Sequence, residues 1–297
     1  MQLGLHTYCL NLHGLGQSWG GFSLPWPRQL STHELLERLV DWGLDGAQID
    51  DAVLESLDLD YVREVGAEAR EKGLFLEYNF SLDVGGLGVG HQHDLGDALD
   101  IAVALGADVV KMSVDLVRPR PLVGSRFHPE VVAQMERAIP VLRAHAPAAA
   151  EHGIRIAVEN HTDLFSDELL WLLDEVGHAH VGVCLDPMNA LHVTEDPMQA
   201  IERLAPRSFT NHFRDERLES QIWGFRLVGC PVAEGDLDAR RCYESLRDVS
   251  PCERLIIETD LDIPLDDRET ALRVEIEAIE RSIRFCRDVL GVGGDDD

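Results

Sequence analysis

The chain has 297 residues, and its 54 acidic side chains outnumber the 26 basic ones, which gives a formal net charge of -28 at pH 7. A surface this acidic repels nucleic-acid backbones and anionic membrane surfaces, so neither is expected as a partner. No run of about 18 apolar residues predicts a transmembrane helix, and the strand-like N-terminus lacks the basic start of a signal peptide. The six cysteines form no CxxC pair, so we expect a reduced, cytoplasmic protein without a cysteine zinc site.

Strand-like and helix-like segments alternate along the whole chain. The first helix should begin at Ser31 and Glu34, whose spacing is that of a capping box. Another helix should begin at a cap formed by Ser166 or Asp167. Longer amphipathic helices are expected at 129–152 and 268–290, and strands near 2–7, 45–50, 74–80, 108–113, 154–160, 181–186, 207–213 and 254–259.

Eight strand–helix units within fewer than 300 residues predict an α/β protein with a (β/α)8 TIM-barrel fold. A doubly wound sheet is the rival interpretation, but the sequence lacks the glycine-rich phosphate-binding turn that such sheets carry after an early strand. No shift in composition marks a domain boundary. We therefore expect one barrel domain over residues 1–290, followed by a flexible acidic tail over 291–297.

A metal-ligating side chain lies near the end of each of the last four predicted strands. These side chains are Glu159, Asp186, His212 and Glu258, in the segments IRIAVEN, VGVCLD, SFTNHF and LIIET. Active sites of such barrels lie where the carboxyl ends of the strands meet, so the four side chains should converge. Three carboxylates and one imidazole favour Mn²⁺, with Mg²⁺ or Co²⁺ as alternatives, over a thiolate-type zinc site.

These motifs resemble those of the xylose isomerase-like TIM-barrel superfamily, which includes the sugar phosphate isomerases and epimerases. The resemblance covers nearly the whole chain and is strongest from 154 to 260. The motifs AVEN, CLDPMN, NHFRD and IIETD carry the four metal ligands of that superfamily onto Glu159, Asp186, His212 and Glu258. The segment GFRLVGCPVAEGDLD is similar to a loop of the same group that ends in a short turn, here at 234–236.

The resemblance implies a divalent-metal-dependent sugar isomerase or epimerase that abstracts a proton next to a carbonyl and passes through a metal-bound enediolate. Glu159 and Glu258 would then be metal ligands and acid–base groups at once. Strand alternation directs His161 into the same mouth as Glu159, where it could donate a proton. Lys111, one of only two lysines, ends the fourth strand and could stabilise an enolate or assist decarboxylation.

Further residues at strand ends and in mouth loops are expected to bind the substrate. Some epimerases have a substrate-binding histidine where this chain has Asn189, which can hydrogen-bond a sugar oxygen but cannot take a proton. Arg217 could hold an anionic group, and it or Asp215 could orient His212. The predicted substrate-binding residues are His6, Asn189, Arg217, Glu77 and Trp19.

A lyase on the same scaffold is the main alternative. Decarboxylation of a keto-sugar acid, dehydration of a keto-inositol or cleavage of a 3-keto-glycoside would suit Lys111, His161 and the Asn189 variant. A non-catalytic sugar-binding barrel would not need two acid–base carboxylates, and an apurinic endonuclease would need further histidines and a D-x-H pair that the chain lacks. The expected partner is a small sugar or keto-sugar, and the resemblance is compatible with a homo-oligomer.

Overall fold

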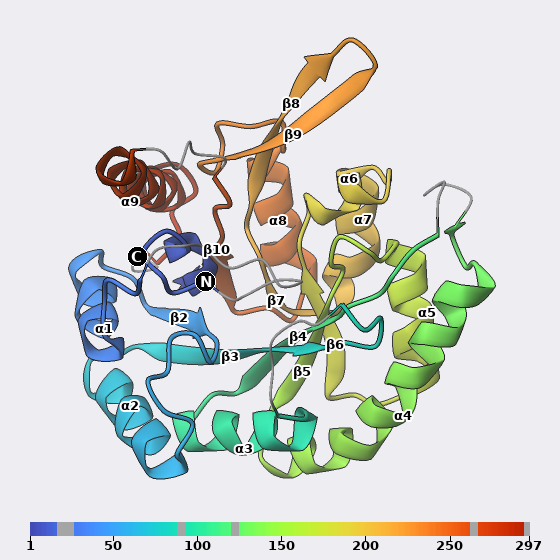
Figure 1. The fold of residues 1–297 in the computed structure, drawn as a ribbon, viewed down its shortest axis with the longest axis horizontal. Coiled ribbons are helices and arrows are strands. Elements are labelled where there is room, and N and C mark those ends of the chain that lie inside the picture. The colour runs from blue at the N-terminus through green and yellow to red at the C-terminus, as the bar shows by residue number, and fades with distance from the viewer. Residues whose placement is uncertain (17–26, 88–92, 120–124, 262–266, 294–297) are drawn as a thin grey trace.

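The computed structural model describes residues 1–16, 27–87, 93–119, 125–261 and 267–293, and the structural statements below concern these residues. Eight parallel strands form a nearly closed barrel in the order β10-β1-β2-β3-β4-β5-β6-β7, with helices around its outer side (Figure 1). This confirms the predicted (β/α)8 fold. The barrel strands are β1 (Gln2–His6), β2 (Gly46–Ile49), β3 (Phe75–Leu82), β4 (Val109–Val114), β5 (Arg155–Glu159), β6 (Val181–Leu185), β7 (Ser208–Asn211) and β10 (Arg254–Ile257).

The helices connect successive strands and cover the sheet. They are α1 (Thr32–Asp41), α2 (Leu59–Glu71), α3 (Leu95–Leu105), α4 (Pro129–Glu151), α5 (Ser166–Val176), α6 (Asn189–His192), α7 (Pro197–Leu204), α8 (Ala239–Val249) and α9 (Arg268–Arg284), with short helical turns at η1 (Thr7–Leu10), η3 (Ala205–Arg207) and η4 (Phe285–Val289). Among the described residues, no helix combines the length and the apolar character that crossing a membrane requires.

The predicted caps are right for α1 and wrong for α5. Ser31 and Glu34 form the expected reciprocal capping box at the start of α1. At α5, however, Ser166 lies inside the first turn, and its hydroxyl donates to Glu195. The Glu168 carboxylate instead accepts a hydrogen bond from the Phe165 amide. A buried acceptor from the same helix has therefore taken the place of the expected side-chain cap.

The gap between the two end strands, β7 and β10, is bridged by a side chain as well as by backbone. Only Phe213 and Ile257 form a backbone bridge across this seam. Below them, the buried side chain of Asn211 accepts from the Ile256 amide at 3.2 Å and donates to the Arg254 carbonyl at 2.8 Å. One carboxamide thus satisfies two buried backbone groups that the ladder leaves unpaired.

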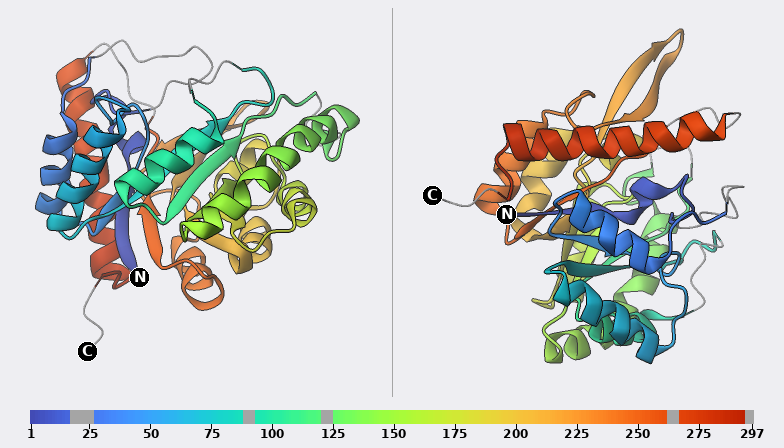
Figure 2. Two further views of the ribbon diagram at one scale, coloured as in Figure 1. Left: turned by 90° about the horizontal axis from the view of Figure 1, so that it is seen from below. Right: turned by 90° about the vertical axis from the view of Figure 1, so that its left-hand side faces the viewer.

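An antiparallel hairpin that the sequence did not predict follows β7. Its strands are β8 (Asp215–Gln221) and β9 (Gly224–Cys230), so the expected loop is partly a strand. The hairpin projects beyond the helices (Figures 1 and 2) and exposes 95% of Trp223 at its tip. At the other end of the chain, the amide of Gly293 donates to the carbonyl of Met1. The first residues of the predicted tail are therefore packed, and residues 294–297 lie outside the described part.

Candidate metal centre

The four predicted ligands come together at the carboxyl ends of their strands. Glu159 is the last residue of β5, and Asp186, His212 and Glu258 directly follow β6, β7 and β10. All four side chains are buried, and one ligand atom from each lies within 4.8 Å of the others. His212 Nδ1 lies 3.0 Å from Glu159 Oε1, 2.9 Å from Glu258 Oε2 and 4.0 Å from Asp186 Oδ2.

Local hydrogen bonds orient Asp186 toward this centre. Its Oδ1 accepts from the amides of Met188 and Asn189, just before the short helix α6 and at its first residue. The Asn160 side chain brackets the Asp186 backbone, donating to its carbonyl at 2.7 Å and accepting from its amide at 2.8 Å. These contacts hold the backbone and one carboxylate oxygen in place, so the Oδ2 atom faces the other three ligands.

The electrostatics of the four residues suit a cation. Burial lowers the pKa of His212, but Cys184 and the carboxylates of Glu258 and Glu159 outweigh it and raise this pKa well above its ordinary value. Burial, with Glu258 and Glu159, raises the pKa of Asp186 to about 7 despite the nearby Arg214. Without a metal, the protonated imidazole lies among the carboxylates, with Lys111 and Arg214 as further positive charges beside Glu159 and Asp186. A divalent ion fits there, since the donor set is rich in oxygen.

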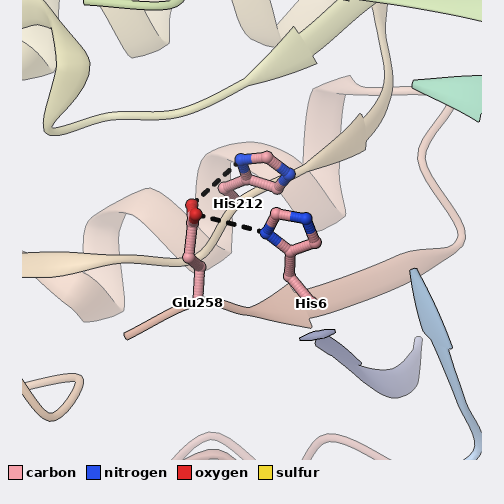
Figure 3. Close-up of side chains that lie close together, drawn as sticks. All are labelled: His6, His212 and Glu258. Atoms are coloured by element: carbon pink, nitrogen blue, oxygen red, sulfur yellow. Dashed lines mark hydrogen bonds and ion pairs between the residues drawn. The ribbon is translucent and has the colours of Figure 1, made fainter. Parts of the chain in front are cut away.

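The imidazole of His6, predicted to bind substrate, stacks against that of His212. The two ring centroids are 4.6 Å apart, and both rings face the Glu258 carboxylate (Figure 3). His6 Nδ1 lies 3.2 Å from Glu258 Oε1. Burial and His212 lower the pKa of His6 to about 4, so the ring is neutral at pH 7 and its Nδ1–H can donate to this carboxylate. His6 thereby fixes the oxygen of Glu258 that does not face His212.

Lys111 projects from β4 into the same cavity and pairs with Glu159. Its Nζ lies 2.7 Å from Glu159 Oε2, and both side chains are buried. Burial opposes the charge of Lys111, but Glu159 outweighs it and raises the pKa of the ammonium group. Burial would likewise raise the pKa of Glu159, but Lys111 and His212 hold it well below its ordinary value. Glu159 is therefore a charged carboxylate with reduced basicity.

Arg214 is a residue of the cavity that the sequence analysis missed. Its Nη2 donates to Asn189 Oδ1 at 2.6 Å, and its Nε lies 3.3 Å from Asp186 Oδ2. Asn189 in turn donates to Glu159 Oε1 at 3.1 Å and to Asp186 Oδ2 at 2.9 Å. The position of Arg214, two residues beyond His212, was a usable signal, because residues two apart in an extended segment point the same way.

The remaining predicted residues are divided between the cavity and other places. His161 lines a cavity of about 210 Å³ that also contains His6, Lys111, Asn189 and the four ligands, together with the unpredicted Tyr8, His192 and Asp260. Burial lowers the pKa of His161 to about 4, so its imidazole is neutral. Its Nδ1 lies 3.9 Å from Asp115 Oδ1.

Two residues predicted to touch substrate lie elsewhere. Glu77 is fully buried inside the barrel, where it accepts from Gln48, Thr210 and Arg254 rather than lining the cavity. Arg217 is exposed on β8. Asp215 does not orient His212, because its carboxylate accepts from the amides of Gly235 and Leu237 at the base of the hairpin. Trp19 lies outside the described residues.

Comparison with known proteins identifies the family. The model of the family described as xylose isomerase-like TIM barrel matches residues 36–288. The chain belongs to this family. Its members differ in the reactions they catalyse, so membership establishes the fold and an enzyme-like scaffold but not the substrate.

Proteins similar to this xylose isomerase-like barrel differ in the activities that their names state. The 3-oxo-isoapionate decarboxylase of Pectobacterium atrosepticum is 26% identical over 259 residues, which are 86% of this chain and 83% of that protein. A crystal structure of D-psicose 3-epimerase in the presence of D-fructose superposes with a TM-score of 0.68 and 14% identity, covering 98% of this chain and 100% of that one. The IOLI protein with a bound zinc atom gives a TM-score of 0.61 and 14% identity, covering 96% and 98%.

Proposed function

We propose that this barrel is a divalent-metal-dependent enzyme that acts on a keto-sugar through an enediolate, and that decarboxylation of a keto-sugar acid is the reaction its site supports best. The observation that carries this choice is the buried ion pair between Lys111 and Glu159, at 2.7 Å. It places a charged ammonium group, and not a free carboxylate base, beside the ligand cluster.

Glu159, Asp186, His212 and Glu258 would hold the metal ion, with Mn²⁺ as the first candidate and Mg²⁺ or Co²⁺ as alternatives. A bound divalent ion stabilises negative charge that develops on a substrate oxygen. Asn189 and Arg214 keep two of the ligand carboxylates apart and oriented. His6 does the same for Glu258.

Decarboxylation requires a proton donor at the end of the reaction. The bond between the substrate carbon and its carboxylate breaks, CO₂ leaves, and the electron pair remains as an enediolate whose carbon must then take up one proton. Lys111 is buried, lines the cavity and is held in its charged form. It would give its proton to that carbon and regain one from water. The name of the Pectobacterium relative, a decarboxylase of an oxidised sugar acid, supports this substrate class.

A sugar isomerase or epimerase is the second candidate. It is favoured by the presence of two carboxylates, Glu159 and Glu258, at one centre, and by the shared fold of D-psicose 3-epimerase. Epimerisation needs a carboxylate to remove a proton from carbon. The lowered pKa of Glu159 makes it a weak base for this step, which is why we rank this reaction second.

One experiment separates these reactions. The purified protein is stripped with chelator, reloaded with Mn²⁺, Co²⁺ or Mg²⁺, and incubated in D₂O with keto-sugar acids and neutral keto-sugars. Metal-dependent loss of CO₂ with one deuterium in the product supports decarboxylation. Deuterium at carbon without any loss of mass from the carbon skeleton identifies an isomerase or epimerase, and loss of water identifies a dehydratase. No metal binding and no exchange with any sugar would contradict both candidates.

The ligand set can be tested with Glu258→Gln. We expect this variant to fold, because the amide can still accept from His6, but to lose bound metal and turnover. Metal analysis and kinetics of the same preparation check this, and full activity with full metal content would remove Glu258 from the site.

All six cysteines are buried and unbridged, which supports the proposed cytoplasmic location.

A further inference from the structure

The interior of the barrel below the ligand cluster is unusually polar. Barrels of this fold are usually filled by branched aliphatic side chains. Here Gln48, Glu77 and Thr210 are fully buried in that position, and Arg254 approaches them from the opposite end of the barrel. Burying so many polar groups costs free energy unless each one has a partner. Their partners form a continuous series of hydrogen bonds that connects these residues to His212.

The chain of hydrogen bonds begins at the ring nitrogen of His212 that faces away from the ligand carboxylates. His212 Nε2 lies 2.8 Å from Gln48 Oε1. Gln48 Nε2 donates to Glu77 Oε2 at 3.0 Å. Glu77 also accepts from Thr210 Oγ1 at 2.7 Å and from Arg254 Nη1 at 3.1 Å. Arg254 is itself anchored by Asp108 and lies over the ring of Phe75, 4.3 Å from its centroid.

The direction of these bonds is fixed by Glu77. A carboxylate can only accept, so the amide of Gln48 must turn its NH₂ group toward Glu77 and its oxygen toward His212. If the amide were reversed, two acceptors would face each other at 3.0 Å. The amide oxygen can only accept, so His212 Nε2 must carry a hydrogen. The nitrogen left to bind a metal is Nδ1, the atom that faces the three carboxylates.

We propose that Gln48 and Glu77 are positioning residues that hold His212 with Nε2 protonated and Nδ1 directed at the metal. This inference rests on the proposed metal-dependent function and assigns a role there to Glu77, which does not touch the cavity. Arg254 Nη1 donates to Glu77 Oε1 at 3.1 Å and anchors that carboxylate from the opposite end of the barrel. Outer partners of this kind typically change metal affinity about 10- to 100-fold.

The test compares Glu77→Gln, Gln48→Leu and a matched control. A glutamine at 77 can offer its NH₂ group to Gln48 and so removes the preferred direction of the amide, whereas Gln48→Leu removes the acceptor for His212. The control is Glu275→Gln, the same substitution at another buried carboxylate, which pairs with His13 and does not line the cavity. Mn²⁺ dissociation constants are measured on chelator-stripped protein, and the Nε2–H proton of His212 is followed by NMR of histidine-labelled protein with and without Zn²⁺.

We expect the Mn²⁺ dissociation constant to rise about 10- to 100-fold in Glu77→Gln and in Gln48→Leu, and to stay unchanged in the control. The Nε2–H signal of His212 should be protected from exchange in the wild type and in the control, and lost in Gln48→Leu. The proposal would be overturned if the folded Glu77→Gln and Gln48→Leu variants bound Mn²⁺ as tightly as the wild type does. An unprotected Nε2–H signal of His212 in the wild type would also overturn it. If the wild type binds no metal, the metal-dependent function fails, and the NMR signal still decides the orientation of His212. Should Glu77→Gln not fold, Gln48→Leu carries the test.

Discussion

Lys111 gives the sharpest prediction at the level of a single residue. Replacing it with methionine keeps an unbranched apolar side chain and removes the ammonium group that lies 2.7 Å from Glu159. We expect turnover to fall by about 100-fold or more, the usual effect of losing a positioned proton donor. Bound metal should remain near the wild-type level, because Lys111 is not a ligand. Steady-state kinetics and metal analysis of the same preparation check both parts.

The chain provides its own control for this substitution. Lys72 is the other lysine of the sequence and pairs with Glu37 and Glu68 on the surface. Lys72→Met should leave turnover unchanged, since exposed ion pairs contribute little. If Lys111→Met kept roughly a third or more of the wild-type turnover, Lys111 would not be the proton donor.

Asp115 should make stability depend on pH. Burial, with Asp83 and Glu159, raises its pKa from 3.8 to about 6. The folded chain therefore binds this proton more tightly than the unfolded chain does, so stability is lost as the pH rises from about 4 to 6. Asp115→Asn removes this loss and should stabilise the protein by about 2 to 3 kcal/mol at pH 8.

This gain for Asp115→Asn should shrink as the pH falls through 6 and vanish near 4. Chemical denaturation of both proteins at several pH values measures it. A gain that stays constant over this range would mean that Asp115 does not titrate with a raised pKa.

The residues of the site were predictable to different extents. The metal ligands stand at the ends of strands, so one rule about barrel topology brings Glu159 and Asp186 together from separate segments. Arg214 obeys strand alternation and could have been found in the same way. The roles of Gln48 and Glu77 could not be predicted, because each depends on which buried partner the side chain meets across the barrel.

At the level of elements, the seam between β7 and β10 is the place to test. Asn211→Ala should remove the side-chain acceptor of the Ile256 amide and one of the two side-chain donors to the Arg254 carbonyl, which keeps the Cys252 thiol at 2.9 Å. A buried backbone group that loses its partner costs about 1 to 3 kcal/mol, so we expect a loss of about 1 to 3 kcal/mol in the free energy of unfolding, from the Ile256 amide. Urea denaturation measures it. A loss below about 0.5 kcal/mol would show that water or the backbone replaces the amide.

The eight barrel strands were predicted because each is buried on both faces and reads as an apolar run between helices. The β8–β9 hairpin was not, because its strands have few buried side chains to give them a pattern. Residues 219–226 are all exposed, and the turn carries Ile222 and Trp223 rather than an Asn-Gly pair. Backbone pairing from Asp215 with Cys230 to Gln221 with Gly224 holds the hairpin together, and such pairing leaves no periodic pattern in the sequence.

For the whole molecule, the net charge of -28 is the dominant feature. Surface ion pairs such as Arg273 with Glu277 are present, but each is worth little. They leave most of the acidic excess uncompensated, and mutual repulsion of these charges opposes the folded state. Salt therefore has two opposite effects on stability. It weakens the ion pairs, which destabilises the fold, and it screens the repulsion, which stabilises the fold; the second effect is the larger.

We predict that the melting temperature rises by several degrees between about 0.1 M and 1 M KCl, as the screening length falls from about 10 Å to 3 Å. Thermal melts followed by circular dichroism measure this. The control is a triple variant, Glu64→Gln, Glu136→Gln and Glu244→Gln, at three exposed helical positions. It should melt higher than the wild type at low salt and respond less to KCl, because fewer charges remain to be screened. A melting temperature that is flat or falls with KCl would show that the ion pairs, and not the repulsion, govern the stability of the barrel.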